Sequence, residues 1–285
     1  MSHRARKRFG QNFLNDRGVI ERIVDAVGEP DDTPLVEIGP GLAALTLPLL
    51  ERHGCLNVIE VDRDLVAKLK SRNLPGLVVH EGDALEVDFV TLAQQLDTRA
   101  GSQVGSRADD RLDPAKLRLV GNLPYNIGTP LILKLVRQQA AVRSLHVMLQ
   151  LEVIERLTAT PGNKHWGRLS VMTNAVFDIT RLFDVPPEAF DPAPKVQSAV
   201  ARLVPRESVP TQAQLDVLEK VARLAFANRR KTLRNNFKGI LAPEALEQAG
   251  VNPGDRAERL ELNQLQALAE LLPVSASDTM PGQGN

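Results

Sequence analysis

The segment GNLPYNIGTPL, residues 121–131, brings together residue types that could activate an exocyclic amine for alkylation. An adenine amine is a poor nucleophile, because its lone pair is delocalised into the ring. Two acceptors aimed at its hydrogens, the side-chain oxygen of Asn122 and the carbonyl of Leu123, would favour a tetrahedral nitrogen that faces an incoming methyl group. Pro124 offers no competing N–H, and Tyr125 gives a flat face on which an extruded base can stack. The segment predicts methyl transfer by alignment and fixed dipoles.

A proline turn that only caps a buried strand is the alternative interpretation of this segment. The turn follows the apolar run LRLV, so it should lie at the carboxyl end of a strand. Open α/β sheets bind ligands at that edge, and this favours the chemical interpretation.

An earlier glycine turn could bind the methyl donor. Residues 39–44, GPGLAA, fit the pattern G-x-G-x-x-A, and Glu60 follows Gly39 by 21 residues. Glycines let the backbone approach a ligand closely, and the acid can bind ribose hydroxyls. This pattern alone fits NAD, S-adenosylmethionine or a tight turn without a ligand. Asp83 could accept a hydrogen bond from an adenine amine, and the chain offers no partner group for hydride transfer, so S-adenosylmethionine is favoured.

Strands and helices must alternate to position these residues. Apolar runs followed by helical patterns are LVEI, residues 58–61, GLVVH, LRLV and SLHVMLQ. This alternation predicts a mostly parallel sheet that is covered on both faces. Residues 179–186 and 196–205 predict a closing hairpin that adds an antiparallel edge. The polar residues 97–116 predict a long exposed loop.

The pattern becomes helical beyond PRESVP, which predicts two domains and a tail. We expect a cofactor-binding domain over residues 1–207, whose first 14 residues form a basic arm and a cofactor-lining segment. A small helical domain is expected over residues 208–274. The last residues, 275–285, predict a disordered tail.

Composition limits the class of protein. The 285 residues carry no net charge and one cysteine, Cys55, which excludes a disulfide scaffold, indicates a reducing cytoplasm and is expected to be buried. No apolar run approaches the roughly 18 residues of a membrane span. Histidine and cysteine spacing predicts no metal site. Two basic clusters, near residues 4–8 and 223–238, predict contact with a polyanion. A monomer is expected, because no long heptads occur.

Eight separated motifs make the chain resemble a known family. In order they are RKRFGQNFL, VEIGPGLAALT, VIEVDRDL, GDAL, GNLPYNI, GRLSV, FDPAPKVQSAV and NRRKTLRN. They are similar to those of the bacterial small-subunit rRNA adenine N6-dimethyltransferases, the KsgA/RsmA family. The resemblance implies an α/β Rossmann-like methyltransferase fold with a small all-α C-terminal domain. It also implies dimethylation of two adjacent adenines in the 3′-terminal hairpin loop of 16S rRNA, within an immature small ribosomal subunit.

The resemblance further implies a role for individual residues. By motif position, the residues that would line the S-adenosylmethionine site are Asn12, Leu14, Gly39, Glu60, Asp83 and Asn122. Asn122 would touch both the cofactor and the target amine, and Tyr125 and Phe190 would sandwich the flipped adenine. Without the resemblance, Phe190 would be assigned to the core. The residues that would contact rRNA are Arg6, Lys7, Arg8, Arg229, Arg230 and Lys231.

Some residues depart from the family pattern, and other functions fit parts of it. Trp166 stands where relatives carry a tyrosine and is expected in the core or at a domain contact, and Asp191 adds an acid beside Phe190. A ribosome-assembly factor that acts mainly by binding would show the same basic clusters. Large-subunit rRNA methyltransferases usually show Ile in place of Leu123, and DNA adenine methyltransferases more often show Asp-Pro-Pro-Tyr. A mitochondrial relative should carry a targeting segment.

Overall fold

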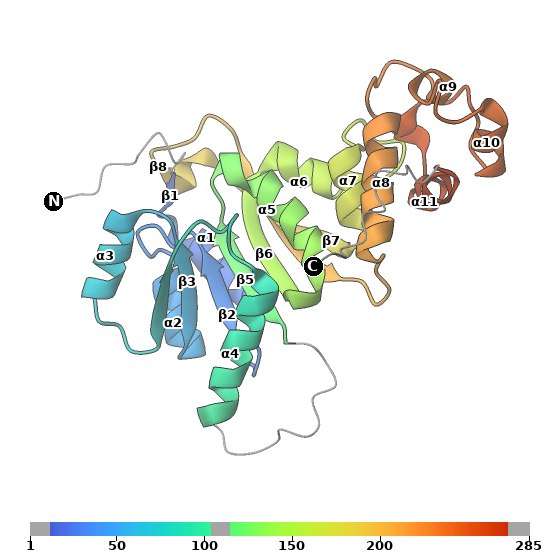
Figure 1. Ribbon diagram of the computed structural model, residues 1–285. Helices are drawn as coiled ribbons and strands as arrows, with labels where there is room; N and C mark the ends of the chain where they lie inside the picture. The colour runs from blue at the N-terminus through green and yellow to red at the C-terminus, as the bar shows by residue number, and fades with distance from the viewer. Residues whose placement is uncertain (1–11, 104–114, 273–285) are drawn as a thin grey trace. The chain divides into compact units, whose positions relative to one another are not determined.

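Seven strands form one sheet in the computed structural model, which describes residues 12–103 and 115–272 (Figure 1). Their order is β4-β3-β2-β5-β6-β9-β7. The strands are β2 (Leu35–Ile38), β3 (Leu56–Glu60), β4 (Leu77–Glu81), β5 (Leu117–Asn122), β6 (Val142–Gln150), β7 (Phe177–Val185) and β9 (Ser198–Pro205). Strands β2 to β6 pair in parallel, whereas β9 pairs antiparallel with both β6 and β7. This confirms the predicted mostly parallel sheet and its antiparallel edge.

The strand order reverses between β2 and β5. From β2 the chain moves outward through α2 (Thr46–His53) and α3 (Arg63–Ser71) to β3 and β4. It returns through α4 (Phe89–Gln103) to β5 and continues the other way through α5 (Tyr125–Arg137) to β6. Right-handed crossovers in opposite directions put the two sets of helices on opposite faces of the sheet. A ligand crevice is expected at the reversal, outside the carboxyl ends of β2 and β5.

The two strands that flank this reversal lie unusually close together at Gly121. A Cβ atom on Gly121 would lie 2.7 Å from the carbonyl oxygen of Ile38, a backbone atom that cannot rotate away. Only glycine therefore allows β5 to reach the crevice beside β2 in this position. The glycine of GNLPY sets the position of the residues that follow it.

Helix α1 (Arg17–Val27) begins at Asp16, whose carboxylate accepts a hydrogen bond from the Val19 N–H at 2.8 Å. Helix α4 continues to Gln103. Residues 97–103, which we expected in a loop, are therefore helical, and residues 104–114 lie outside the described residues. Cys55 is exposed, so the prediction that it is buried was wrong.

The described chain divides into two compact units. Of the described residues, the first unit contains 12–103, 115–158 and 176–209, and the second contains 159–175 and 210–272. The helices of the second unit, called the helical unit below, are α7 (Arg168–Asn174), α8 (Gln212–Ala225), α9 (Leu233–Asn236), α10 (Pro243–Gln248) and α11 (Leu262–Leu271). The boundary after Val209 lies near the predicted one, but the segment 159–175, which we expected in the first domain, clusters with the second unit.

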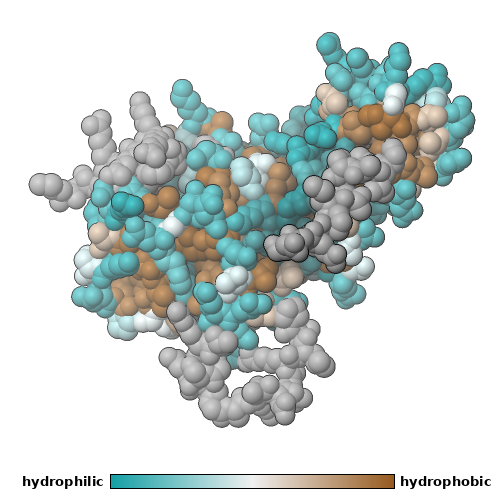
Figure 2. Space-filling view, viewed as in Figure 1, coloured by the Kyte–Doolittle hydropathy of each residue, from teal (hydrophilic) through white to brown (hydrophobic). Residues whose placement is uncertain are grey.

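Trp166 shows why that segment belongs to the helical unit. It is buried, and its Nε1 donates to the carbonyl of Leu260 at 3.1 Å. Of the two predicted places for Trp166, the core or a domain contact, its burial and this bond within one unit indicate the core. Hydrophilic residues predominate at the outer edge of this unit on the face drawn in Figure 2. Among residues 12–103 and 115–272, every helix is too short or too polar to span a bilayer.

Candidate active site

A cavity of about 320 Å³ lies at the carboxyl ends of the parallel strands. Four segments line it at the ends of strands. Gly39 follows β2, Glu60 ends β3, Asp83 follows β4 and Asn122 ends β5. Four residues that are widely separated in sequence therefore meet at one edge of the sheet. This edge includes the reversal of strand order, where the fold predicts a ligand crevice.

Glu60 fixes the glycine turn at the floor of the cavity. Its Oε2 accepts from the Gly41 N–H at 3.2 Å, and its Oε1 accepts from the Asp62 N–H at 2.9 Å. Gly39 and Gly41 both have positive φ angles, of 72° and 56°, a conformation that side chains disfavour. Burial raises the pKa of Glu60 above its ordinary value, although the N–H groups of Asp62 and Gly41 oppose this shift. The acid therefore both faces the cavity and holds the turn in shape.

Asp83 lies in the loop after β4 and is half-buried at the cavity wall. Its Oδ1 accepts from the Leu85 N–H at 2.9 Å, which fixes the orientation of the carboxylate. A carboxylate oxygen has more than one lone pair, so this contact leaves acceptor capacity toward the cavity.

The NLPY turn closes the cavity at the end of β5. Nδ2 of Asn122 donates to the carbonyl of Asn12 at 3.4 Å, which leaves Oδ1 as the acceptor of this amide. The Leu123 N–H donates to the carbonyl of Met148 at 3.2 Å, so the backbone of Leu123 is anchored to the neighbouring strand. Pro124 is the N-cap of α5, and the helix begins at Tyr125, whose side chain lies outside the described residues.

Two segments far apart in sequence form a short ribbon at the cavity. Strand β1 (Phe13–Leu14) pairs antiparallel with β8 (Phe190–Asp191), and Leu14 lies opposite Phe190. Asn12, Leu14 and Phe190 all line the cavity. Phe190 is only 6% exposed and also belongs to the hydrophobic core, so core packing and a role at the cavity are compatible for this ring.

Glu37 is a cavity residue that sequence reasoning missed. It is the third residue of the otherwise apolar β2, is fully enclosed and lines the cavity. Burial, with a contribution from the Glu60 carboxylate, raises the pKa of Glu37 to about 8. Its Oε2 is buried and has no hydrogen-bond partner among the described residues. The signal was available in the sequence, because a charged residue inside LVEI contradicts the expected pattern of a buried strand.

The basic residues expected to contact RNA differ in what the structure shows of them. Arg6, Lys7 and Arg8 lie outside the described residues. Arg229, Arg230 and Lys231 are exposed, in the loop between α8 and α9. The guanidinium of Arg229 donates to the carbonyls of Lys164 and Trp166 at 2.6 and 3.0 Å, so this side chain also ties two segments of the helical unit together.

Known proteins resemble this chain over nearly its whole length. The ribosomal RNA adenine dimethylase family matches residues 2–273. The ribosomal RNA small subunit methyltransferase A of Chromohalobacter salexigens is 48% identical over 279 residues, which cover 96% of this chain and 94% of that protein. The protein of the same name from Aromatoleum aromaticum is 47% identical over 276 residues, or 96% of each chain.

Two solved structures share the fold. A dimethyladenosine transferase from Plasmodium falciparum has a TM-score of 0.71 at 24% identity, over 91% of this chain and 97% of that one. The 23S rRNA methyltransferase ErmE has a TM-score of 0.65 at 26% identity, over 92% of this chain and 99% of that one. Since the family match spans nearly the entire sequence and the fold agrees with it, this chain belongs to the ribosomal RNA adenine dimethylase family, a family of S-adenosylmethionine-dependent methyltransferases.

Proposed function

We propose that this chain dimethylates the N6 amines of two adjacent adenines in the 3′-terminal hairpin loop of 16S rRNA, in the cytoplasm, while the small ribosomal subunit matures. The observation that carries this proposal is the 48% identity, over 96% of the chain, to a small-subunit methyltransferase. The sequence identity to a large-subunit enzyme, the 23S rRNA methyltransferase ErmE, is lower, at 26%. Large-subunit rRNA is therefore the less well supported substrate.

The cavity residues suit S-adenosylmethionine, which combines cationic groups with a ribose diol and an adenine amine. Glu37 lines the cavity with a buried carboxyl, and a cationic group of the cofactor beside it would favour the ionised, accepting form of this carboxyl. Glu60 can accept from ribose hydroxyls with its remaining lone pairs, and Asp83 can accept from the adenine amine. When bound, the cofactor supplies a methyl group activated by its sulfonium.

The NLPY turn would prepare the target amine. Oδ1 of Asn122 and the carbonyl of Leu123 would accept the two N6 hydrogens, so that the lone pair develops toward the methyl group. Both acceptors are held in place before substrate arrives, by the contacts to Asn12 and Met148. Preorganised dipoles of this kind lower the barrier without a strong base. The proton leaves after the methyl is attached, when the nitrogen has become acidic.

The substrate base would stack between Tyr125 and Phe190. The ring of Phe190 is fixed by core packing and lines the cavity, so little side-chain entropy is lost on binding. Base stacking of this kind contributes about 1–3 kcal/mol. The base must leave its own stack to reach the cavity, which favours loops over duplex.

The rRNA itself would contact basic side chains of both ends of the chain. We propose residues 208–274, the helical domain expected from the sequence, as an rRNA-binding domain, in which Arg230 and Lys231 are exposed. The N-terminal arm with Arg6, Lys7 and Arg8 would add phosphate contacts. Such contacts release counterions and make binding depend on salt.

Asn122→Ala tests this assignment of roles. Methylation of immature small subunits would be followed by mass spectrometry of 16S rRNA, and subunit binding would be measured separately. We expect a loss of about 10²–10³ in the rate, with binding retained. The exposed Asn15→Ala is the matched control and should leave both unchanged.

Two results would contradict the proposal. If the wild-type chain forms no dimethyladenosine in 16S rRNA, the enzymatic function is wrong. If Asn122→Ala retains full activity, the amide does not prepare the amine. An equal loss of binding and activity would favour the alternative of an assembly factor that acts mainly by binding.

A further inference from the structure

A second cavity lies at the opposite edge of the sheet, where β5 and β6 begin and β9 ends. Its volume is about 840 Å³. Its lining includes five basic side chains and three acidic ones, which gives a net charge of +2. The basic residues are Lys116, Arg118, Arg143, Arg202 and Arg206. None of them belongs to the candidate active site.

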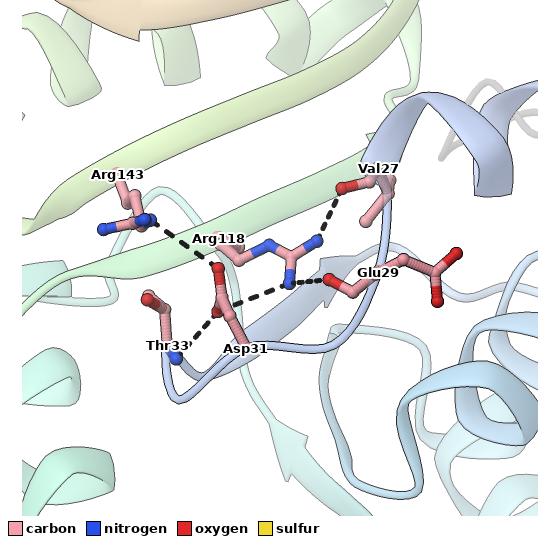
Figure 3. A network of polar contacts seen from close by, with 6 residues as sticks. All are labelled: Val27, Glu29, Asp31, Thr33, Arg118 and Arg143. Atoms are coloured by element: carbon pink, nitrogen blue, oxygen red, sulfur yellow. Dashed lines mark hydrogen bonds and ion pairs between the residues drawn. The ribbon is translucent and has the colours of Figure 1, made fainter.

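Arg118 forms the fixed floor of this second cavity (Figure 3). The side chain is buried, and its guanidinium donates to the carbonyls of Val27 and Glu29 at 2.5 and 3.0 Å. These carbonyls orient the group but carry no net charge. The single carboxylate of Asp31 lies 3.4 Å from Arg118 and 3.7 Å from Arg143. Two guanidinium charges therefore share one carboxylate, and the floor retains a positive charge.

His146 provides a second and independent feature of the cavity wall. It lies on β6 and is 3% exposed, yet its Nε2 has no hydrogen-bond partner among the described residues. The other ring nitrogen donates to the backbone carbonyl of Ala26, so the proton is on that side of the ring. Burial and the charges of Arg202 and Arg118 lower the pKa of His146 to about 4. Near pH 7 its Nε2 is therefore an acceptor that lacks a donor.

Arg202 stands beside this histidine. The two residues are direct cross-strand partners in the antiparallel pair of β6 and β9, so their side chains project from the same face of the sheet. Arg202 is exposed, and none of the ion pairs among the described residues involves it. A charged donor and a neutral acceptor thus face the same space.

We propose that this second cavity binds a ribose phosphate, whose phosphate pairs with Arg202 and whose hydroxyl donates to Nε2 of His146. An anion without a hydroxyl group would satisfy the guanidinium and leave the imidazole nitrogen unpaired, whereas a neutral sugar would do the reverse. A phosphate joined to a ribose hydroxyl satisfies both. Arg143 and Lys116 add positive potential at the rim of the cavity. The ribose phosphate can belong to an RNA strand or to a free nucleotide.

Binding to the full-length chain tests this proposal without any methylation assay. The probes are a single-stranded oligoribonucleotide, the oligodeoxyribonucleotide of the same sequence, uridine 3′-monophosphate and inorganic phosphate. The variants are Arg202→Gln and the control Arg72→Gln, an exposed arginine outside the cavity. The readouts are dissociation constants and the assigned imidazole resonances of His146.

We expect the ribose-containing probe to shift the His146 resonances and Arg202→Gln to weaken its binding about tenfold, the value of one charge-assisted hydrogen bond. Arg72→Gln should bind like wild type. The deoxy probe keeps the phosphate but lacks the ribose hydroxyl, so it should remain sensitive to Arg202→Gln and shift the His146 resonances much less. If the His146 resonances shift with uridine 3′-monophosphate but not with the oligoribonucleotide, the ligand is a free nucleotide. If they shift with the oligoribonucleotide but not with the mononucleotide, the ligand is an RNA strand. Unmoved His146 resonances, equal effects of the two variants, or an equal shift with inorganic phosphate would overturn the proposal.

Discussion

Glu37→Gln should remove a dependence of stability on pH that the buried acid imposes. Burial raises the pKa of Glu37 to about 8 in the folded chain, against 4.5 for the ordinary side chain. Between these values the folded state holds a proton that the unfolded state has released. The stability that this proton contributes is fully present below pH 4.5 and is lost as the pH rises through about 8.

The best range for the measurement is pH 6.5 to 8. Burial and Arg202 lower the pKa of His146 to about 4, so His146 changes the stability with pH in the opposite direction. This contribution is confined to pH values below 6.5, the ordinary pKa of histidine. Above pH 6.5 the effect of Glu37 remains. Between pH 6.5 and pH 8, the proton on Glu37 should change the free energy of unfolding by about 1.5 kcal/mol. Each pH unit contributes about 1.4 kcal/mol, and the change begins to level off near pH 8.

Urea denaturation of the cofactor-free protein, followed by circular dichroism, measures this difference. The free energy of unfolding of wild type minus that of Glu37→Gln should fall by about 1.5 kcal/mol from pH 6.5 to pH 8. Glu86→Gln, which changes an exposed glutamate outside the cavity, should follow the wild type. Parallel profiles for wild type and Glu37→Gln would refute the buried-proton argument.

Three further substitutions test other parts of the structure. Gly121→Ala would place its methyl 2.7 Å from a backbone carbonyl oxygen of β2, so urea denaturation should show a loss of about 1–3 kcal/mol; unchanged stability would contradict the close approach. Asp83→Ala should weaken S-adenosylmethionine binding about 10- to 100-fold by calorimetry, from the loss of a charged hydrogen bond, while Glu86→Ala binds normally; equal affinities would remove Asp83 from the site. Arg229→Ala should lower the melting temperature by about 2–4 °C because its guanidinium ties two carbonyls. Arg230→Ala should instead only flatten the salt dependence of RNA binding by about 0.7–0.9 in slope, and identical behaviour of the two variants would refute this division.

The sheet could be predicted from the sequence because its signals are local. Apolar runs such as LVEI and LRLV end in glycine or in GNLPY, and each run became a buried strand of the parallel sheet. The helical nature of residues 97–103 could not be predicted in this way, because Gly and Ser in that stretch favour a loop when neighbouring packing is ignored. Cys55 was misplaced for a similar reason, since exposure depends on the position of a turn and not on residue type.

The cavity was only partly predictable. The glycine turn, Glu60 and NLPY follow from the rule that parallel strands present their carboxyl ends at one edge. The pairing of residues 13–14 with residues 190–191 depends on long-range contact that no local pattern encodes. The same is true of His146, whose unpaired nitrogen becomes visible only when β6, β9 and α1 are assembled around it.

The β1–β8 ribbon also has a consequence for how the cavity walls can move. Leu14 and Phe190 are paired directly in this ribbon, whose two strands have two residues each. Because the two backbones are paired, a displacement of one strand would displace the other. A ligand that contacts Leu14 and shifts its backbone would therefore also shift the backbone of Phe190. The strand pairing thus couples the two walls of the cavity that Leu14 and Phe190 line.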